Sequence, residues 1–167
     1  MQRILLIGSP GAGKSTLARA LGARFNLPVT HLDRLWWQPG WVELGHEKFR
    51  PLVEEAVAKD KWVIDGNYSA TWDLRMPRAD TILWLDLPRR VCMWRAFRRS
   101  LTLYRKVRAD LAPGCPERFD MEFFRYVWTF KAAHEEKTMD ALRRYGRHAR
   151  IVRLRSDEDI RNFVSGL

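Results

Sequence analysis

The chain has 167 residues, of which 46% are hydrophobic, and this length favours one domain, residues 1–167, with a sizeable core. No apolar run approaches the length of a membrane span, and Cys92 and Cys115 make neither a disulfide framework nor a metal-ligand spacing. We therefore expect a cytoplasmic protein, monomer or homodimer, with no signal peptide and no membrane partner.

The net charge of +10 is unevenly distributed along the chain. Residues 75–155 hold 20 basic against 9 acidic side chains, whereas residues 1–74 hold 9 against 8. Such a surplus is typical of a nucleic-acid surface, and equally of a lid that closes on a polyphosphate. Composition alone leaves both interpretations open.

Apolar periodicity and turn signals divide the chain into alternating strands and helices. In chain order they predict a strand at 3–7, a helix at 14–25, a strand at 29–32, a helix at 46–59, strands at 62–65 and 81–87, helices at 89–107 and about 117–143, a strand at 151–154 and a helix at 157–165. This order indicates an α/β fold with a five-stranded parallel sheet, helices on both of its faces, and ligands at the carboxyl ends of the strands.

A complete phosphate-loop motif, G-x-x-x-x-G-K-[ST], lies between the first predicted strand and the first predicted helix. Its glycines let successive backbone N–H groups face one anion, and the helix N-terminus adds partial positive charge. The motif predicts that Lys14 reaches the β- and γ-phosphates of ATP and that the Ser15 hydroxyl binds Mg²⁺. The expected nucleotide-binding residues are Gly8, Pro10, Gly11, Ala12, Gly13, Lys14, Ser15 and Thr16.

Two aspartates follow predicted strands at the same edge of the sheet. Asp65 ends one strand and is expected to share the magnesium with Ser15. Asp33 follows another and is a candidate base for an acceptor hydroxyl, or a ligand of the magnesium or the acceptor. Either aspartate could instead cap the next element, which is the preferred interpretation for Asp86 before Pro88.

The order of these motifs resembles that of adenylate-kinase-like small kinases. The segments His31–Trp41, Trp62–Tyr68 and Ile82–Pro88 resemble the bacterial proteins called topology modulation proteins of the FlaR type. The resemblance implies a P-loop NTPase fold with an acceptor-binding segment at 33–60 and a helical lid at about 95–143.

The resemblance to adenylate kinases ends where the acceptor would bind. Those enzymes follow the third-strand aspartate with Gly-Phe-Pro-Arg, and the arginine holds the acceptor phosphate. Here Asn67 and Tyr68 follow Gly66, and the next arginine is Arg75. Arg75 is therefore a candidate acceptor contact, and the motif does not imply AMP as the acceptor.

Tryptophans gather after Asp33, in the segment where this superfamily binds its acceptor. Trp37 and Trp41, ahead of Trp36, could stack on a planar acceptor, because Pro39 and Gly40 place them on a loop or broken helix. The alternative is that these rings only fasten a mobile loop to the core.

Arg95 and Arg99 are four residues apart and therefore share one face of a predicted helix. The resemblance implies that such a pair contacts adenine and phosphate, and that Arg155, after the last strand, lies near the base. Fixed arginines suit the charge that develops during phosphoryl transfer, although a solvated basic face is the alternative.

Together these features predict a kinase that transfers a phosphoryl group from MgATP to a small acceptor, with Lys14, Asp33, Arg95 and Arg99 as catalytic residues. The competing hypothesis is a nucleic-acid-associated NTPase, favoured by the basic segment 75–155 and by the name of the resembling family. Against it stands the absence of any recognisable DNA-reading motif.

Overall fold

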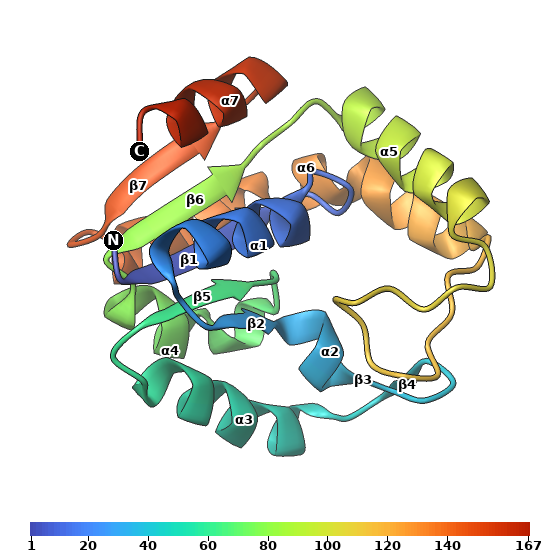
Figure 1. Ribbon diagram of the computed structural model, residues 1–167, viewed down its shortest axis with the longest axis horizontal. Helices are drawn as coiled ribbons and strands as arrows, with labels where there is room; N and C mark the ends of the chain where they lie inside the picture. The colour runs from blue at the N-terminus through green and yellow to red at the C-terminus, as the bar shows by residue number, and fades with distance from the viewer.

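The computed structural model describes all 167 residues and confirms the α/β prediction. Its main sheet is parallel throughout, with the strand order β2-β5-β1-β6-β7. These strands are β1 (Arg3–Gly8), β2 (Val29–His31), β5 (Trp62–Asp65), β6 (Thr81–Leu85) and β7 (Arg150–Leu154). Since the strands are parallel, all their carboxyl ends meet at one edge, which faces right in Figure 1.

Helices cover both faces of the sheet, and the alternating side chains of β1 form two cores. Leu5 and Ile7 belong to a core closed by α2, α3, α4 and the end of α6, whereas Ile4 and Leu6 belong to a core closed by α1, α5 and the start of α6, with α7 packed at its margin (Figure 1). The helices are α1 (Lys14–Phe25), α2 (Leu32–Trp36), α3 (His46–Ala58), α4 (Trp72–Arg75), α5 (Arg89–Thr102), α6 (Met121–Tyr145) and α7 (Asp157–Ser165).

The predicted helix at 89–107 is too long, because α5 ends at Thr102. Arg105 has a positive φ of 61°, and its backbone N–H donates to Glu117 O instead of continuing a helix. Residues 103–120, which we call the strap, then run as an irregular segment to α6. The helix predicted from 117 begins only at Met121, because the Asp120 side chain caps it by accepting hydrogen bonds from the N–H groups of Glu122 and Phe123.

The segment after β2 holds structure that the apolar pattern did not predict. The strand expected at 29–32 stops at His31, and α2 follows at once. A short antiparallel hairpin, β3 (Trp37–Gln38) and β4 (Val42–Glu43), then reaches toward the strap. Gly40 N donates to Gly114 O at 2.8 Å, so the hairpin and the strap are joined through their backbones.

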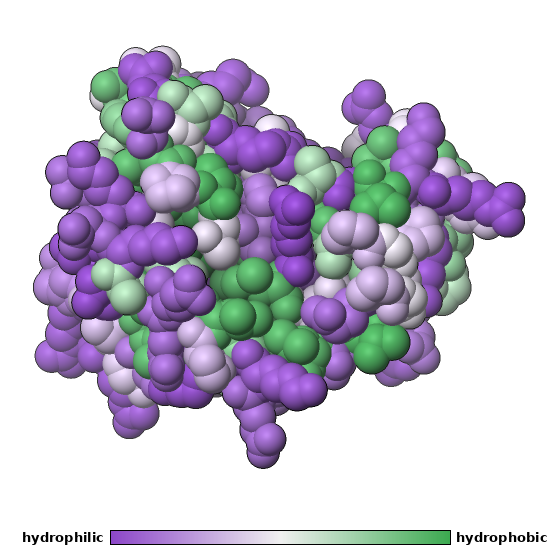
Figure 2. Space-filling view, turned by 60° about the horizontal axis from the view of Figure 1, so that its bottom comes forward, coloured by the Kyte–Doolittle hydropathy of each residue, from purple (hydrophilic) through white to green (hydrophobic).

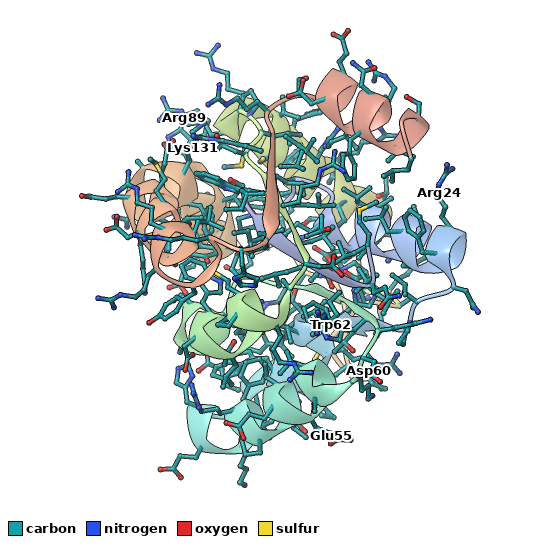
Figure 3. All side chains as sticks on the ribbon, turned by 90° about the vertical axis from the view of Figure 1, so that its left-hand side faces the viewer. Arg24, Glu55, Asp60, Trp62, Arg89 and Lys131 are labelled. Atoms are coloured by element: carbon teal, nitrogen blue, oxygen red, sulfur yellow. The ribbon has the colours of Figure 1, made fainter.

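A cluster of charges around buried Asp86 joins β6, β7 and α6. Asp86 is 3% exposed and forms ion pairs with Lys131 at 3.0 Å and with Arg153 at 2.6 Å. In the view of Figure 3, Lys131 of α6 and Arg89 of α5 both lie at the upper left of the molecule. Asp86 therefore connects elements in the core, and the capping role expected for it is wrong.

The outward face of α5 is unexpectedly apolar. Trp94 and Leu101 are 62% and 57% exposed, and the helix buries only Cys92, Ala96 and Ser100. On the face in Figure 2, hydrophilic side chains predominate and the apolar residues form separate patches. None of the helices combines the length and the apolar character needed to cross a bilayer.

Candidate nucleotide and acceptor site

The phosphate loop joins β1 to α1 at the carboxyl edge of the sheet, as its position in the sequence predicts (Figure 1). Gly8, Gly11 and Gly13 all have positive φ values. At Gly11 a side chain is also excluded by space, since a Cβ there would lie 2.4 Å from the carbonyl oxygen of Cys92 on α5. The loop thus needs glycine both for its turn and for close packing against the start of α5.

Lys14, the first residue of α1, folds back over the loop. Its Nζ donates hydrogen bonds to the backbone oxygens of Gly8 at 2.8 Å and Ser9 at 3.0 Å. Burial lowers the pKa of Lys14, while the carboxylates of Asp33 and Asp65 act in the opposite direction. The ammonium group is therefore held at the loop with two carboxylates in electrostatic range.

Asp65 lies between Ser15 and His31 and contacts both. Ser15 Oγ donates to Asp65 Oδ2 at 2.6 Å, and His31 Nδ1 lies 2.5 Å from Asp65 Oδ1. The structure thus brings the two predicted magnesium ligands together. A hydroxyl and a carboxylate are oxygen donors of the kind Mg²⁺ prefers, so the pair fits a magnesium site beside the phosphate loop.

Asp33 lies in the first turn of α2 and faces Tyr68. The Tyr68 hydroxyl donates a hydrogen bond to Asp33 Oδ1 at 2.7 Å. Burial raises the pKa of Asp33, while this hydrogen bond and the charge of Lys14 oppose the increase. A carboxylate made more basic by burial, next to the phosphate loop, has the character of a general base.

The expectation that Arg75 contacts the acceptor does not agree with its position, because the side chain is completely buried. Its guanidinium donates to the backbone oxygens of Gly66, Asn67 and Tyr68 and to the Thr71 hydroxyl. Burial lowers its pKa to about 9, so it is still charged at neutral pH. Its donors are occupied in shaping the loop after β5 and do not face a ligand.

Trp37 and Trp41 pack against the strap. Their ring centroids are 5.4 Å apart in an edge-to-face arrangement, and both rings cover the small apolar cluster of Leu111, Ala112 and Cys115. Trp41 Nε1 also donates to Pro116 O at 3.0 Å. These contacts agree with the fastening of a loop, which was the alternative to acceptor stacking.

Arg95 and Arg155 lie on the side of the phosphate loop where α7 begins. Arg95 Nη1 donates to Ala12 O at 3.2 Å, and its Nη2 donates to Asp157 Oδ1 at 2.5 Å. The backbone N–H of Arg155 donates to Asp159 Oδ2, while the residue itself is exposed. Arg95 therefore connects the phosphate loop to α7, and Arg155 flanks the same region.

Arg99 is held by the strap and not by the phosphate loop. It donates from Nε to Glu117 Oε1 at 3.1 Å, and the same carboxyl group lies 3.0 Å from Nε of Arg108. Burial lowers the pKa of Arg99, and the neighbouring positive charge of Arg108 lowers it further. Arg95 and Arg99 therefore contact different segments, and the arginine that lies with Arg99 at Glu117 is Arg108 of the strap.

Sequence reasoning missed three residues at this site: Asn67, His31 and Arg108. The Asn67 side chain exchanges two hydrogen bonds with the Gly8 backbone, at 2.9 and 2.8 Å, and so supports the start of the phosphate loop. Position at a strand end could have indicated Asn67 and His31, as it indicated Asp65. Arg108 carries no such signal, because only the fold of the strap brings it to the site.

Comparison with known proteins gives partial sequence matches and full-length structural matches. Residues 4–67 match the model of the ATPase family associated with various cellular activities (AAA). A shikimate kinase of Thermobifida fusca is 42% identical over 62 residues, and the ATP-dependent zinc metalloprotease FtsH 1 of Sorangium cellulosum is 43% identical over 53 residues. These matches take in 33% and 32% of this chain, but only 36% and 9% of the lengths of those relatives.

Solved structures match the whole fold at low sequence identity. A shikimate kinase from Bacteroides thetaiotaomicron superposes with a TM-score of 0.55 and 21% identity, covering 99% of this chain and 95% of its own. The shikimate kinase from Acinetobacter baumannii in complex with shikimate also gives 0.55, with 14% identity and coverage of 99% and 94%. The chain therefore has the fold of the P-loop kinases, with the phosphate loop at its expected place in that fold.

Proposed function

We propose that the protein is a P-loop kinase that transfers the γ-phosphoryl group of ATP to a small-molecule acceptor. The observation that carries this proposal is the juxtaposition of four groups at one edge of the sheet. Lys14 lies over the phosphate loop, Ser15 and Asp65 are in contact, and Asp33 is hydrogen-bonded to Tyr68. The partial similarity to a shikimate kinase and the shared fold support the same assignment.

In the proposed reaction each group has a separate task. The N–H groups of the phosphate loop and Lys14 hold the phosphates, and Arg99 stabilises the charge that develops during transfer. Ser15 and Asp65 would hold Mg²⁺, which when bound neutralises charge on the β- and γ-phosphates. Arg95 and Arg155 would flank the nucleotide base. The strap, which is the part of the expected lid at 95–143 that belongs to neither sheet core, would exclude water.

We further propose that the acceptor reacts through a hydroxyl group. The hydroxyl oxygen forms a bond to the γ-phosphorus, the bond from that phosphorus to the β–γ bridging oxygen breaks, and the hydroxyl proton passes to Asp33. A hydroxyl acceptor needs such a base, whereas a phosphate acceptor does not. Trp37 and Trp41 would act indirectly in this scheme, by fastening the strap beside the acceptor segment at 33–60.

A turnover screen tests the proposal. MgATP consumption should rise with one class among nucleosides, nucleotides, sugars and hydroxy acids, and Lys14→Ala should reduce that turnover at least about 100-fold, because a group that meets the transferring phosphate is removed. Circular dichroism should be unchanged, since Lys14 is not a core residue. Activity of Lys14→Ala within about tenfold of wild type would contradict the assignment.

A nucleic-acid-associated NTPase is the second candidate, favoured by the basic segment 75–155. It predicts tight binding to double-stranded DNA with a steep salt dependence, the slope growing by about 0.9 for each phosphate neutralised. Sub-micromolar DNA binding at physiological salt, together with no small-molecule acceptor, would favour this function over the kinase.

A further inference from the structure

Glu117 is a strap carboxylate, 5% exposed, that binds two arginines at once. Its Oε1 accepts hydrogen bonds from Arg99 Nε and Ser100 Oγ, both at 3.1 Å. Its Oε2 forms an ion pair with Arg108 Nε at 3.0 Å. Burying a carboxylate is costly unless its charge is balanced, so this is a specific contact and not a surface ion pair.

Glu117 also links the two ends of the strap through its backbone, and it links the strap to α5 through its side chain. The backbone of Glu117 accepts a hydrogen bond from Arg105 N and donates one to Lys106 O, each at 2.9 Å. Arg108 is held a second time by Asp110, at 3.0 Å from its Nη1. Two arginines from different segments are thereby fixed relative to each other by one side chain.

Glu117 holds Arg99 by its Nε, and Asp110 holds Arg108 by its Nη1, so both arginines keep donors for a ligand. Neither terminal nitrogen of Arg99 is hydrogen-bonded within the protein, and Arg108 uses only Nη1 of its two. The two guanidinium groups are also in electrostatic range of the site: the charge of Arg99 acts on Lys14, and that of Arg108 acts on Asp33. A planar guanidinium held by one edge is preorganised for an anion at the other.

Resting on the proposed kinase function, we infer that Glu117 is a positioning residue, which fixes Arg99 and Arg108 relative to each other so that both meet the transferring phosphoryl group. Arg108 then joins Arg99 as a second phosphate-contacting arginine. The opposite role would be restraint, in which Glu117 neutralises the arginines until a nucleotide displaces it. The two roles predict rate changes of opposite sign.

Glu117→Gln separates them, because the amide keeps the size of the side chain and removes its charge. Positioning predicts a kcat lowered about 10- to 100-fold with a nearly unchanged KM for MgATP, since the interaction is made in the transition state. Glu117→Asp keeps the charge and should recover part of the rate. Glu122→Gln, an exposed carboxylate on the first turn of α6, is the matched control and should behave as wild type.

Calorimetry with MgADP and with MgADP plus aluminium fluoride gives a readout that needs no acceptor. Wild type should bind the fluoride complex, a mimic of the transferring phosphoryl group, more tightly than MgADP, and Glu117→Gln should lose that preference while binding MgADP normally. A higher kcat in Glu117→Gln, or an unchanged preference, would overturn the inference. If wild type itself shows no preference, the proposed kinase function fails instead.

Urea unfolding of Glu117→Gln and Glu117→Asp shows whether a loss of activity is merely structural. Equal loss of MgADP affinity and of stability in these two variants would also overturn positioning.

Discussion

At the scale of single residues, the site depends on how burial changes the chemistry of a few polar groups. Asp33 and Arg75 illustrate two outcomes. Burial raises the pKa of Asp33 and leaves its carboxylate with one neutral partner, the Tyr68 hydroxyl. Arg75 is also buried, but backbone oxygens satisfy its donors, so its charge organises a loop. Residue type alone did not distinguish the proposed base from a residue whose donors are used within the protein.

The raised pKa of Asp33 predicts a pH dependence. A base must be ionised, so kcat/KM should fall as the pH drops through a pKa that lies above the usual value of about 3.9. Tyr68→Phe removes the hydrogen bond that opposes the increase, and should move this acidic limb to higher pH. Asp33→Asn should lower kcat about 10²- to 10⁴-fold and abolish the limb.

Profiles of kcat/KM against pH for wild type, Tyr68→Phe and Asp33→Asn would test this. Tyr145→Phe, at the far end of α6, is the control and should leave the profile where it is in wild type. An acidic limb that stays in place in Tyr68→Phe would mean that another group controls it.

At the scale of elements, the parts that the sequence predicted well are those with strong local signals. The phosphate loop, α1 and α7 have the expected bounds, because glycines and end-capping residues mark them within a few positions. The position of Asp65 at the end of β5 was predicted for the same reason. A parallel sheet brings strand ends together, so Asp65 and Ser15 could be predicted to meet across 50 residues.

The strap and the hairpin could not be predicted in this way, because their structure comes from contacts with each other. Arg105 leaves the helical conformation where its N–H pairs with Glu117, which lies near the other end of the strap. Trp37 and Trp41 were singled out as candidate acceptor contacts, but only the folded strap shows what they cover. Arg108 reaches the site through the same long-range contacts.

The docking of the strap on the hairpin can be tested at two glycines. Gly114 has φ +82°, and a Cβ there would lie 2.8 Å from Pro39 Cβ, whereas Gly40 has φ +81° with open space around it. Alanine at either position should cost about 1–2 kcal/mol of unfolding free energy from backbone strain. Gly114→Ala should cost more, and should expose the strap to proteolysis, because it also pushes the hairpin away.

Urea denaturation and limited proteolysis of the two variants would measure this difference. Gly40→Ala serves as the control for strain without a steric clash. Equal losses of stability and equal cleavage rates would show that the strap does not depend on its contact with the hairpin.

At the scale of the whole molecule, the candidate site is assembled from segments spread over the full chain. The phosphate loop, the ends of β2 and β5, the start of α5 and the strap all meet at the carboxyl edge of one sheet (Figure 1). A nucleotide bound there would contact several of these segments at once. Its binding should therefore stabilise the fold as a unit and not one loop.

This leads to a prediction for thermal unfolding with Mg²⁺ and a non-hydrolysable ATP analogue. At about 100 times its Kd, a ligand that binds only the folded state adds about 2.7 kcal/mol, which for a chain of this size raises Tm by roughly 5–10 °C. Lys14→Ala should lose most of this shift, and EDTA should reduce it in wild type, because Ser15 and Asp65 are expected to act through the metal. A shift produced by double-stranded DNA and not by the nucleotide would instead mean that the basic segment 75–155 is the ligand surface, and would favour the nucleic-acid function.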